Sequence, residues 1–155
     1  MTKEIANSFF NTGVQYFNTY GGNPVSCAIA NAVMNVIEEE NLQENCLNVG
    51  EYLLQRSSEL MREFELIGDV RGLGLFIGVE LVEDRMLRTP ATEAASFVVN
   101  RMKNVHNILV SSDGPDENVV KLKPPMVFNQ KNADEFIAGM KECLNQLKEK
   151  EVILI

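Results

Sequence analysis

The stretch GDVRGLGLFIGVEL, residues 68–81, decides the fold class. Its glycines at 68, 72 and 74 break the helical spacing of the apolar residues that precede it. Over residues 73–82 every odd position is apolar, which is the period of a half-buried β-strand. A strand is therefore predicted in a chain whose other long patterns are helical.

Two helices are predicted before this strand. Asn23 is a good N-cap and Pro24 a good first residue for a helix over Pro24–Glu39. A second helix begins near Asn41, and Gly50 is expected to weaken its middle. Its apolar side carries Leu42, Cys46, Val49, Leu53, Leu60 and Phe64. We expect the two helices to form a helical hairpin.

The chain after the strand predicts a small sheet and two more helices. Thr89–Pro90 restarts a helix by the same cap-then-proline rule. Residues 108–110 and Val119–Leu122 are short strands on either side of a turn at 113–116. A last amphipathic helix covers residues 131–150. The predicted fold class is α+β, with a three-stranded antiparallel sheet, covering helices and a preceding helical hairpin.

The composition excludes several functional classes. The chain has 22 acidic and 14 basic residues and a net charge of −8, so it lacks the basic surface that nucleic acids and anionic membranes require. No apolar run reaches the roughly 18 residues of a membrane-spanning helix, and the start MTKEIANSFF resembles no targeting leader. Cys27, Cys46 and Cys143 fit small core residues in a reducing compartment. With these and the single His106, we expect neither a metal site nor a Ser-His-Asp triad.

A candidate phosphate cradle precedes the first long helix. Thr19, Tyr20, Gly21 and Gly22 combine a hydroxyl donor with two glycines that let the backbone approach a ligand. The helix start adds unpaired N–H groups with partial positive charge. The alternative is a glycine turn followed by an ordinary N-cap, and local physics alone favours that alternative.

Three further patterns contain residues that could bind a ligand. Residues 72–78 have the spacing G-x-G-x-x-x-G and enter a strand, so they predict a turn and close strand packing rather than a dinucleotide site. Arg71 beside Asp69 is expected to form an ion pair. Lys121 and Lys123 project from one face of an apolar strand, where they either meet a carboxylate or phosphate of a substrate or face solvent.

Several segments together resemble one family, in the right order. The segments YFNTYGGNPV (16–25), GDVRGLGLFIGVEL (68–81) and VVKLKPPMV (119–127) are similar to the C-terminal portion of class-III pyridoxal-phosphate-dependent aminotransferases. The nearest resemblance is to the alanine-glyoxylate-aminotransferase-like branch, which includes ethanolamine-phosphate and 5-phosphohydroxy-lysine phospho-lyases. The signals for this branch are RTPAT (88–92), SDGP (112–115) and KLKPPM (121–126). The resemblance implies the small domain of a fold-type-I, α/β-type transferase that works as a homodimer with pyridoxal 5'-phosphate.

The resemblance also implies roles for single residues. The matching Thr in this family hydrogen-bonds the cofactor phosphate across the dimer interface, so Thr19 would serve the partner subunit, with Tyr20, Gly21 and Gly22 shaping the loop. Lys121 aligns with an Arg that binds a substrate carboxylate in ornithine-aminotransferase-like members. A Lys lacks the planar fork of Arg, and the change suits substrates that carry a phosphate, with β-elimination replacing amino transfer.

The family's Schiff-base Lys and the Asp that pairs with the pyridine nitrogen lie upstream of the region that matches Thr2. No Lys of this chain has the Ala-Lys-Gly-x-Gly context of that residue, so the chain is expected to supply no catalytic residue and to be inactive alone. The predicted domains are a remnant of the cofactor domain with its interface loop over 1–22, the small domain with its leading helices over 23–150, and a tail over 151–155.

The sequence leaves two functions open. One is the C-terminal part of a transaminase or phospho-lyase that acts on a small amine or phospho-amine, in the mitochondrion or the cytoplasm. The other is a non-catalytic truncated member that binds a full-length relative or a phosphate group as an interaction module.

Overall fold

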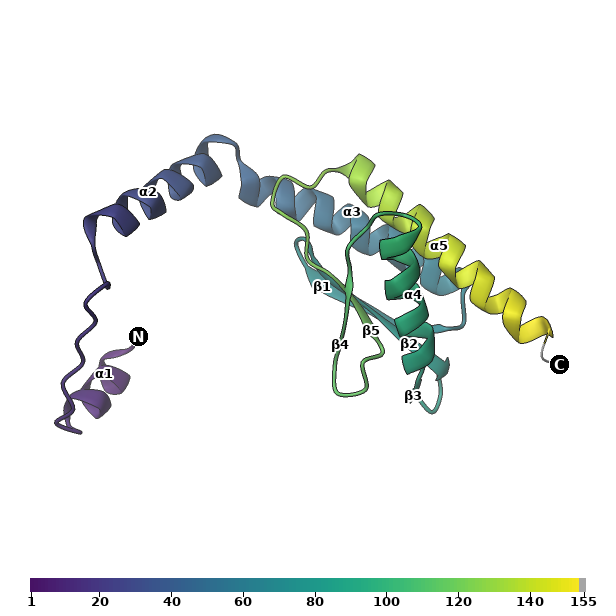
Figure 1. Ribbon diagram of the computed structural model, residues 1–155, viewed down its shortest axis with the longest axis horizontal. Coiled ribbons are helices and arrows are strands. Elements are labelled where there is room, and N and C mark those ends of the chain that lie inside the picture. The colour runs from purple at the N-terminus through teal and green to yellow at the C-terminus, as the bar shows by residue number, and fades with distance from the viewer. Residues whose placement is uncertain (154–155) are drawn as a thin grey trace. The chain divides into compact units, whose positions relative to one another are not determined.

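The computed structural model describes residues 1–153, with side chains through Glu149. The chain divides into two units, Met1–Val36 and Ile37–Ile155, and each is described by itself. Figure 1 labels the helices and strands of both. The boundary falls inside a helix, whereas the domain boundary expected after residue 22 concerns a complete enzyme and stays a prediction.

The first unit consists of two helices and the turn between them. Helix α1 spans Lys3–Phe10. Helix α2 spans Pro24–Glu39, which are the bounds that the sequence predicts for it. Neither helix has a buried residue. The hairpin packing expected for α2 is therefore not confirmed, because its apolar face buries nothing.

The second unit contains eight elements in the described residues. The helices are α3 (Leu42–Glu63), α4 (Thr92–Asn104) and α5 (Gln130–Ile153). The strands are β1 (Ile67–Leu73), β2 (Phe76–Asp84), β3 (Thr89–Pro90), β4 (Ser111–Asp113) and β5 (Val119–Leu122). The expected tail begins as a continuation of α5, and Leu154 and Ile155 lie outside the described residues.

The sheet has the order β1-β2-β5-β4, and β3 pairs with β2. Every pairing is antiparallel, as predicted, but the sheet has five strands where the sequence predicted three. The helices α3 and α4 contact the strands, and α5 packs against both of these helices (Figure 1). The α+β class is confirmed as a sheet with a helical layer.

The predicted strand over residues 73–82 is wrong at its start. The chain turns at Gly74, whose φ of +54° is a backbone conformation that glycine adopts without strain, and β1 and β2 pair across that turn. Of the glycines that interrupt the helical spacing, Gly68 and Gly72 lie in β1 and Gly74 lies in this turn. Close packing explains Gly72, because a Cβ there would stand 2.3 Å from the carbonyl oxygen of Phe76.

The cap-then-proline rule predicted the start of a helix at Thr89–Pro90, and this prediction is wrong. These two residues form the short strand β3. Thr89 pairs with Asp84 and Pro90 with Val82, and the N–H of Ala91 donates to the carbonyl of Leu81. The helix begins two residues later, at Thr92. The strand expected over 108–110 is also displaced, because β4 begins at Ser111.

The core lies between the sheet and the helices. Ile77, Val79 and Leu81 alternate along β2 and are 2% exposed or less, as the odd-position pattern predicts. The helices contribute the apolar faces that their spacing predicts, with Leu53 and Leu60 from α3. The last helix buries Ala133, Phe136, Ile137, Met140 and Leu144.

Gly50 contradicts the expectation that it merely weakens α3. It is buried in the middle of the helix, and a Cβ there would stand 2.2 Å from the carbonyl oxygen of Gly74 in the β1–β2 turn. The missing side chain is what lets the helix approach that turn.

Arg85 ties the end of α3 to the sheet. Its guanidinium donates to the carbonyl of Ile67 at 2.9 Å and to that of Phe64 at 2.8 Å, and a third bond goes to the carbonyl of Met61. These bonds satisfy carbonyl groups at and after the helix C-terminus, which have no partner within the helix.

The three cysteines differ in their surroundings, and only one is the fully buried residue that we expected. Cys143 is buried, Cys46 is half-buried and Cys27 is exposed, and all three are free thiols. Burial raises the pKa of the Cys143 thiol to about 11, so it is protonated at neutral pH. No helix in the described part of the chain is long and apolar enough to cross a membrane.

Candidate functional site

The loop before α2 is organised by Asn18, to which the sequence assigns no role, and by Asn23, the predicted N-cap. The side-chain oxygen of Asn18 accepts the N–H groups of Tyr20 and Gly21, at 3.0 and 3.1 Å. The side-chain oxygen of Asn23 accepts the N–H of Ser26 at 2.9 Å, which is the predicted N-cap. Asparagines at turns and caps are common enough that their presence alone did not reveal this network.

Two side chains of this loop carry exposed hydroxyl groups, those of Thr19 and Tyr20. Thr19 is exposed and lies in the loop that leads into α2. Gly22 has a φ of +70° and no atom lies within 4 Å of the place that a Cβ would take. Because Asn18 already holds the N–H groups of Tyr20 and Gly21, the loop offers hydroxyl groups and open space rather than a complete cradle of N–H groups. This fits one arm of a phosphate site.

A hollow of about 350 Å³ lies on the face of the sheet that the core does not use. In the sheet, Gly78 of β2 pairs with Arg71 of β1 on one side and with Lys121 of β5 on the other. The side chains of Arg71 and Lys121 therefore share that face. Gly78 adds no side chain between the two cations. Other lining residues are Gly72, Leu73, Phe76, Ile77, Asp113, Gly114 and Val119.

Arg71 is held by two carboxylates. Its Nη1 lies 2.7 Å from Asp69 Oδ2, which confirms the predicted ion pair, and 2.6 Å from Glu80 Oε2. Both contacts raise the pKa of Arg71, the one to Asp69 most. Glu80 was missed because only the strand register brings it opposite Asp69.

Lys121 is also paired. Its ammonium donates to Asp113 Oδ2, while Asp113 Oδ1 accepts the N–H of Gly114 at 2.8 Å. The bond to Lys121, followed by that from Gly114, holds the pKa of Asp113 below its usual value. The sequence placed Asp113 only in a turn, and the β4–β5 pairing is what brings it to Lys121.

Lys121 of β5 and Lys123, which directly follows that strand, line different hollows. Lys121 lines the hollow with Arg71, whereas Lys123 lines a neighbouring apolar hollow with Cys46 and Leu47 of α3. Of the two, only Lys121 shares a hollow with a second cation.

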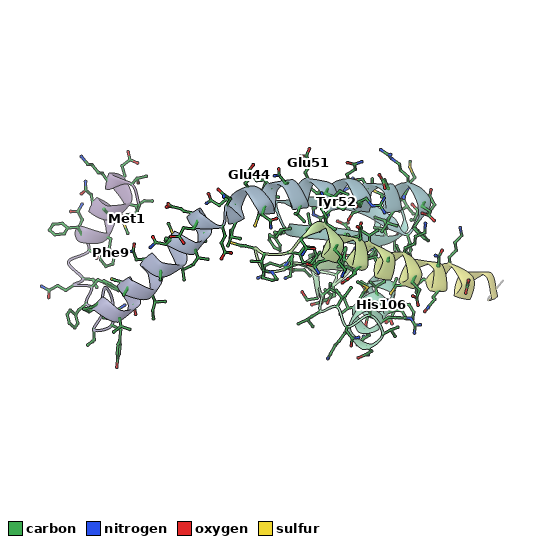
Figure 2. All side chains as sticks on the ribbon, turned by 90° about the horizontal axis from the view of Figure 1, so that it is seen from above. Met1, Phe9, Glu44, Glu51, Tyr52 and His106 are labelled. Atoms are coloured by element: carbon green, nitrogen blue, oxygen red, sulfur yellow. The ribbon has the colours of Figure 1, made fainter. Side chains whose placement is uncertain are left out.

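His106, labelled in Figure 2, lies in the loop after α4 and contacts Glu142 of α5. Its Nε2 is 3.7 Å from Glu142 Oε2, and the same carboxylate is 3.6 Å from Arg101. Tyr52 of α3, also marked in Figure 2, donates to Asp134 of α5 at 2.6 Å. Among the described residues no group of His, Cys, Asp and Glu side chains could hold a metal ion.

The comparisons with known proteins agree with one another. The family model described as aminotransferase class-III matches residues 1–144. The chain is 63% identical over 151 residues to "Alanine--glyoxylate aminotransferase 2-like" of Drosophila melanogaster, covering 97% of this chain and 31% of that protein. It is 42% identical to "Ethanolamine-phosphate phospho-lyase homolog 1" of Caenorhabditis elegans, covering 92% of this chain and 30% of that protein.

Among solved structures, the chain is similar to a phospholyase from Arthrobacter in complex with phosphoethanolamine. The TM-score is 0.83 with 32% identity, over 94% of this chain and 34% of that chain. The chain thus spans about a third of the length of the relatives that it matches.

Proposed function

The chain belongs to the class-III aminotransferase family, and from this we propose that it contributes two binding elements to a homodimeric pyridoxal-phosphate enzyme. One element is the loop at Thr19, which would bind the cofactor phosphate of the partner subunit. The other is Lys121, which would bind an anionic group of a small amine substrate. In the domain assignment that goes with this proposal, residues 1–22 belong with the cofactor domain and residues 23–150 form the small domain.

The observation that carries the proposal is the exposed side chain of Thr19 in the loop that leads into α2. A hydroxyl can donate to a phosphate oxygen, and a helix N-terminus favours negative charge nearby. Gly21 and Gly22 keep side chains out of the approach, and Tyr20 continues the loop. Pyridoxal phosphate, when bound, supplies an electron-withdrawing ring that labilises bonds at the carbon bearing the substrate amine.

Lys121 favours a substrate that carries a phosphate. An arginine can bind a carboxylate or a phosphate through two parallel bonds, whereas a lysine binds a phosphate as a point charge and gives up the bidentate contact with a carboxylate. The Arthrobacter phospholyase, which was solved with phosphoethanolamine, supports the same substrate class. Amino transfer is the second candidate, because the Drosophila relative is named for that activity.

We further propose that this polypeptide alone does not turn over substrate. It spans about a third of its relatives, and no lysine in it has the sequence context of the family's cofactor-binding lysine. The Thr19 loop and Lys121 would bind and orient, while the covalent chemistry would use residues of the other part of the enzyme.

Replacing Thr19 tests the proposal in the complete dimeric enzyme that carries this segment. Thr19→Ala should weaken cofactor binding by about tenfold or more, because it removes one hydrogen bond to a charged group. The measurement is the cofactor dissociation constant, from dialysis followed by absorbance titration. Thr19→Ser, which keeps the hydroxyl, is the matched control and should bind nearly as the parent does. Equal affinity in the Ala and Ser variants would refute the role.

A further inference from the structure

The cation of the hollow that the proposed function assigns to substrate binding already has a carboxylate partner within the chain. Asp113 holds Lys121 from the neighbouring strand β4. The side chains are 51% and 27% exposed, so solvent and ligands can reach the pair. An incoming anion must therefore compete with Asp113 for this ammonium group.

Asp113 is the better fixed of the two partners. Its second oxygen accepts the N–H of Gly114, which adopts a φ of +87° in the turn after β4. The same turn is tied to α4, because the hydroxyl of Thr92 donates to the carbonyl of Asp116 at 2.6 Å. Lys121, by contrast, carries its charge on a flexible four-carbon stem. The ammonium group can move between the carboxylate and a ligand while the carboxylate stays in place.

The charges around the hollow decide which of its two cations an incoming anion can bind more easily. Arg71 is bound by two carboxylates, Asp69 and Glu80, and Lys121 by one. These two cations and three carboxylates sum to −1, and Lys123, whose charge also acts on Asp113, brings the sum to zero, so the hollow does not attract anions by excess positive charge. Lys121 is the cation that an anion can recruit by displacing a single partner.

We propose that Asp113 is an internal counter-ion that competes with anionic ligands for Lys121 and so promotes their release. The proposal rests on the assignment of Lys121 in the proposed function. For an enzyme that liberates phosphate, recapture of Lys121 by Asp113 would help the product to leave the hollow. Asp113 is thus a residue that sets ligand affinity through Lys121, without touching the reacting atoms.

Inorganic phosphate is the probe that tests this proposal on the 155-residue chain. Binding is followed by NMR through the amide shifts of Gly78 and Lys121, at neutral pH and constant ionic strength. Asp113→Asn removes the charge and keeps an oxygen that can accept the N–H of Gly114. Since exposed ion pairs are weak, Asp113→Asn should tighten phosphate binding about two- to fivefold. Circular dichroism melting of each variant verifies that the fold is retained.

A matched control separates the specific ion pair of Asp113 with Lys121 from the general effect of removing one negative charge. Asp116→Asn makes the same change of charge on the same loop, and Asp116 makes no ion pair with Lys121 among the described residues. It should tighten binding clearly less than Asp113→Asn does. Equal effects of the two variants, or no tightening by Asp113→Asn, would overturn the counter-ion proposal.

The variant Lys121→Met separates the counter-ion proposal for Asp113 from the assignment of Lys121 as the anion contact. Loss of binding in this variant, together with no tightening by Asp113→Asn, refutes the counter-ion alone and leaves Lys121 as the anion contact. Binding that is unchanged in Lys121→Met refutes the assignment of Lys121 itself, and the counter-ion proposal with it. The expected result is loss of binding in Lys121→Met and tighter binding in Asp113→Asn.

Discussion

At the scale of single residues, Gly50 sets two physical preferences against each other. Alanine is the better helix former, by about 1 kcal/mol. A Cβ at position 50, however, would stand 2.2 Å from the carbonyl oxygen of Gly74, which is backbone and cannot swing away. We predict that Gly50→Ala destabilises the fold by about 1–3 kcal/mol, as overpacking does in well-packed interiors. Urea unfolding of the chain measures this change in free energy.

Gly139 of α5 is the matched control for this prediction. A Cβ there would stand 2.9 Å from the sulfur of Met102, a flexible side chain that can shift. Gly139→Ala should therefore cost less than Gly50→Ala. An alanine at position 50 that stabilises the chain would mean that α3 moves away from the turn without penalty.

Residue-level predictions succeeded where the partners are neighbours in sequence. The ion pair of Arg71 with Asp69 was predicted and is confirmed, because only one residue separates these two in the sequence. The contacts of Arg71 with Glu80 and of Lys121 with Asp113 depend on strand register, which the sequence does not display. Gly50 was misjudged for the same reason, since its partner Gly74 belongs to another element.

At the scale of elements, the end of α3 depends on one side chain from the β2–β3 turn. Arg85 donates to the carbonyls of Met61, Phe64 and Ile67. We predict that Arg85→Ala destabilises the chain by roughly 1–3 kcal/mol, because it removes three partly buried hydrogen bonds, although the carbonyl of Phe64 keeps the N–H of Ile67 as a donor. Thermal unfolding followed by circular dichroism provides the measurement.

Arg62 supplies the comparison for that variant. It is exposed in the last turn of the same helix, so Arg62→Ala removes an equal charge near the same helix end. Its effect should stay within about 0.5 kcal/mol, as for most surface substitutions. Similar losses in both variants would assign the effect to charge at the helix end rather than to the three bonds of Arg85.

Long periodic elements were predictable, and short strands were not. The bounds of α2 and the buried face of α5 follow from caps and apolar spacing. The alternation that predicted one strand continues through the turn at Gly74, because Leu73 and Leu75 are both apolar although Leu73 is 80% exposed and Leu75 is buried. At Thr89–Pro90 the local pattern of a helix start is overridden by pairing with β2.

At the scale of the whole molecule, binding elements and covalent chemistry are expected to be separable. We predict that the 155-residue chain, supplied with pyridoxal phosphate, releases no phosphate from phosphoethanolamine and transfers no amino group to a keto acid. The reason is that no lysine of the chain has the sequence context of the family's cofactor-binding lysine. Phosphate release and amino-acid formation are measured on the same sample.

The complete enzyme that contains this segment is the positive control and should release phosphate from phosphoethanolamine. Turnover by the chain alone, above the rate of free cofactor in buffer, would contradict the prediction. Amino transfer without phosphate release by the complete enzyme would favour the second candidate function.

The hollow on the sheet has a width that the backbone determines. Gly78 separates Arg71 from Lys121 by one strand, so the two cationic residues start from backbones two strand spacings apart, or about 9.5 Å. Hydrogen bonding between the strands keeps this backbone spacing constant when most side chains are substituted. A lineage that adapts this hollow to a longer or shorter ligand would therefore change side-chain length and charge at positions 71, 113 and 121, and leave the sheet as it is.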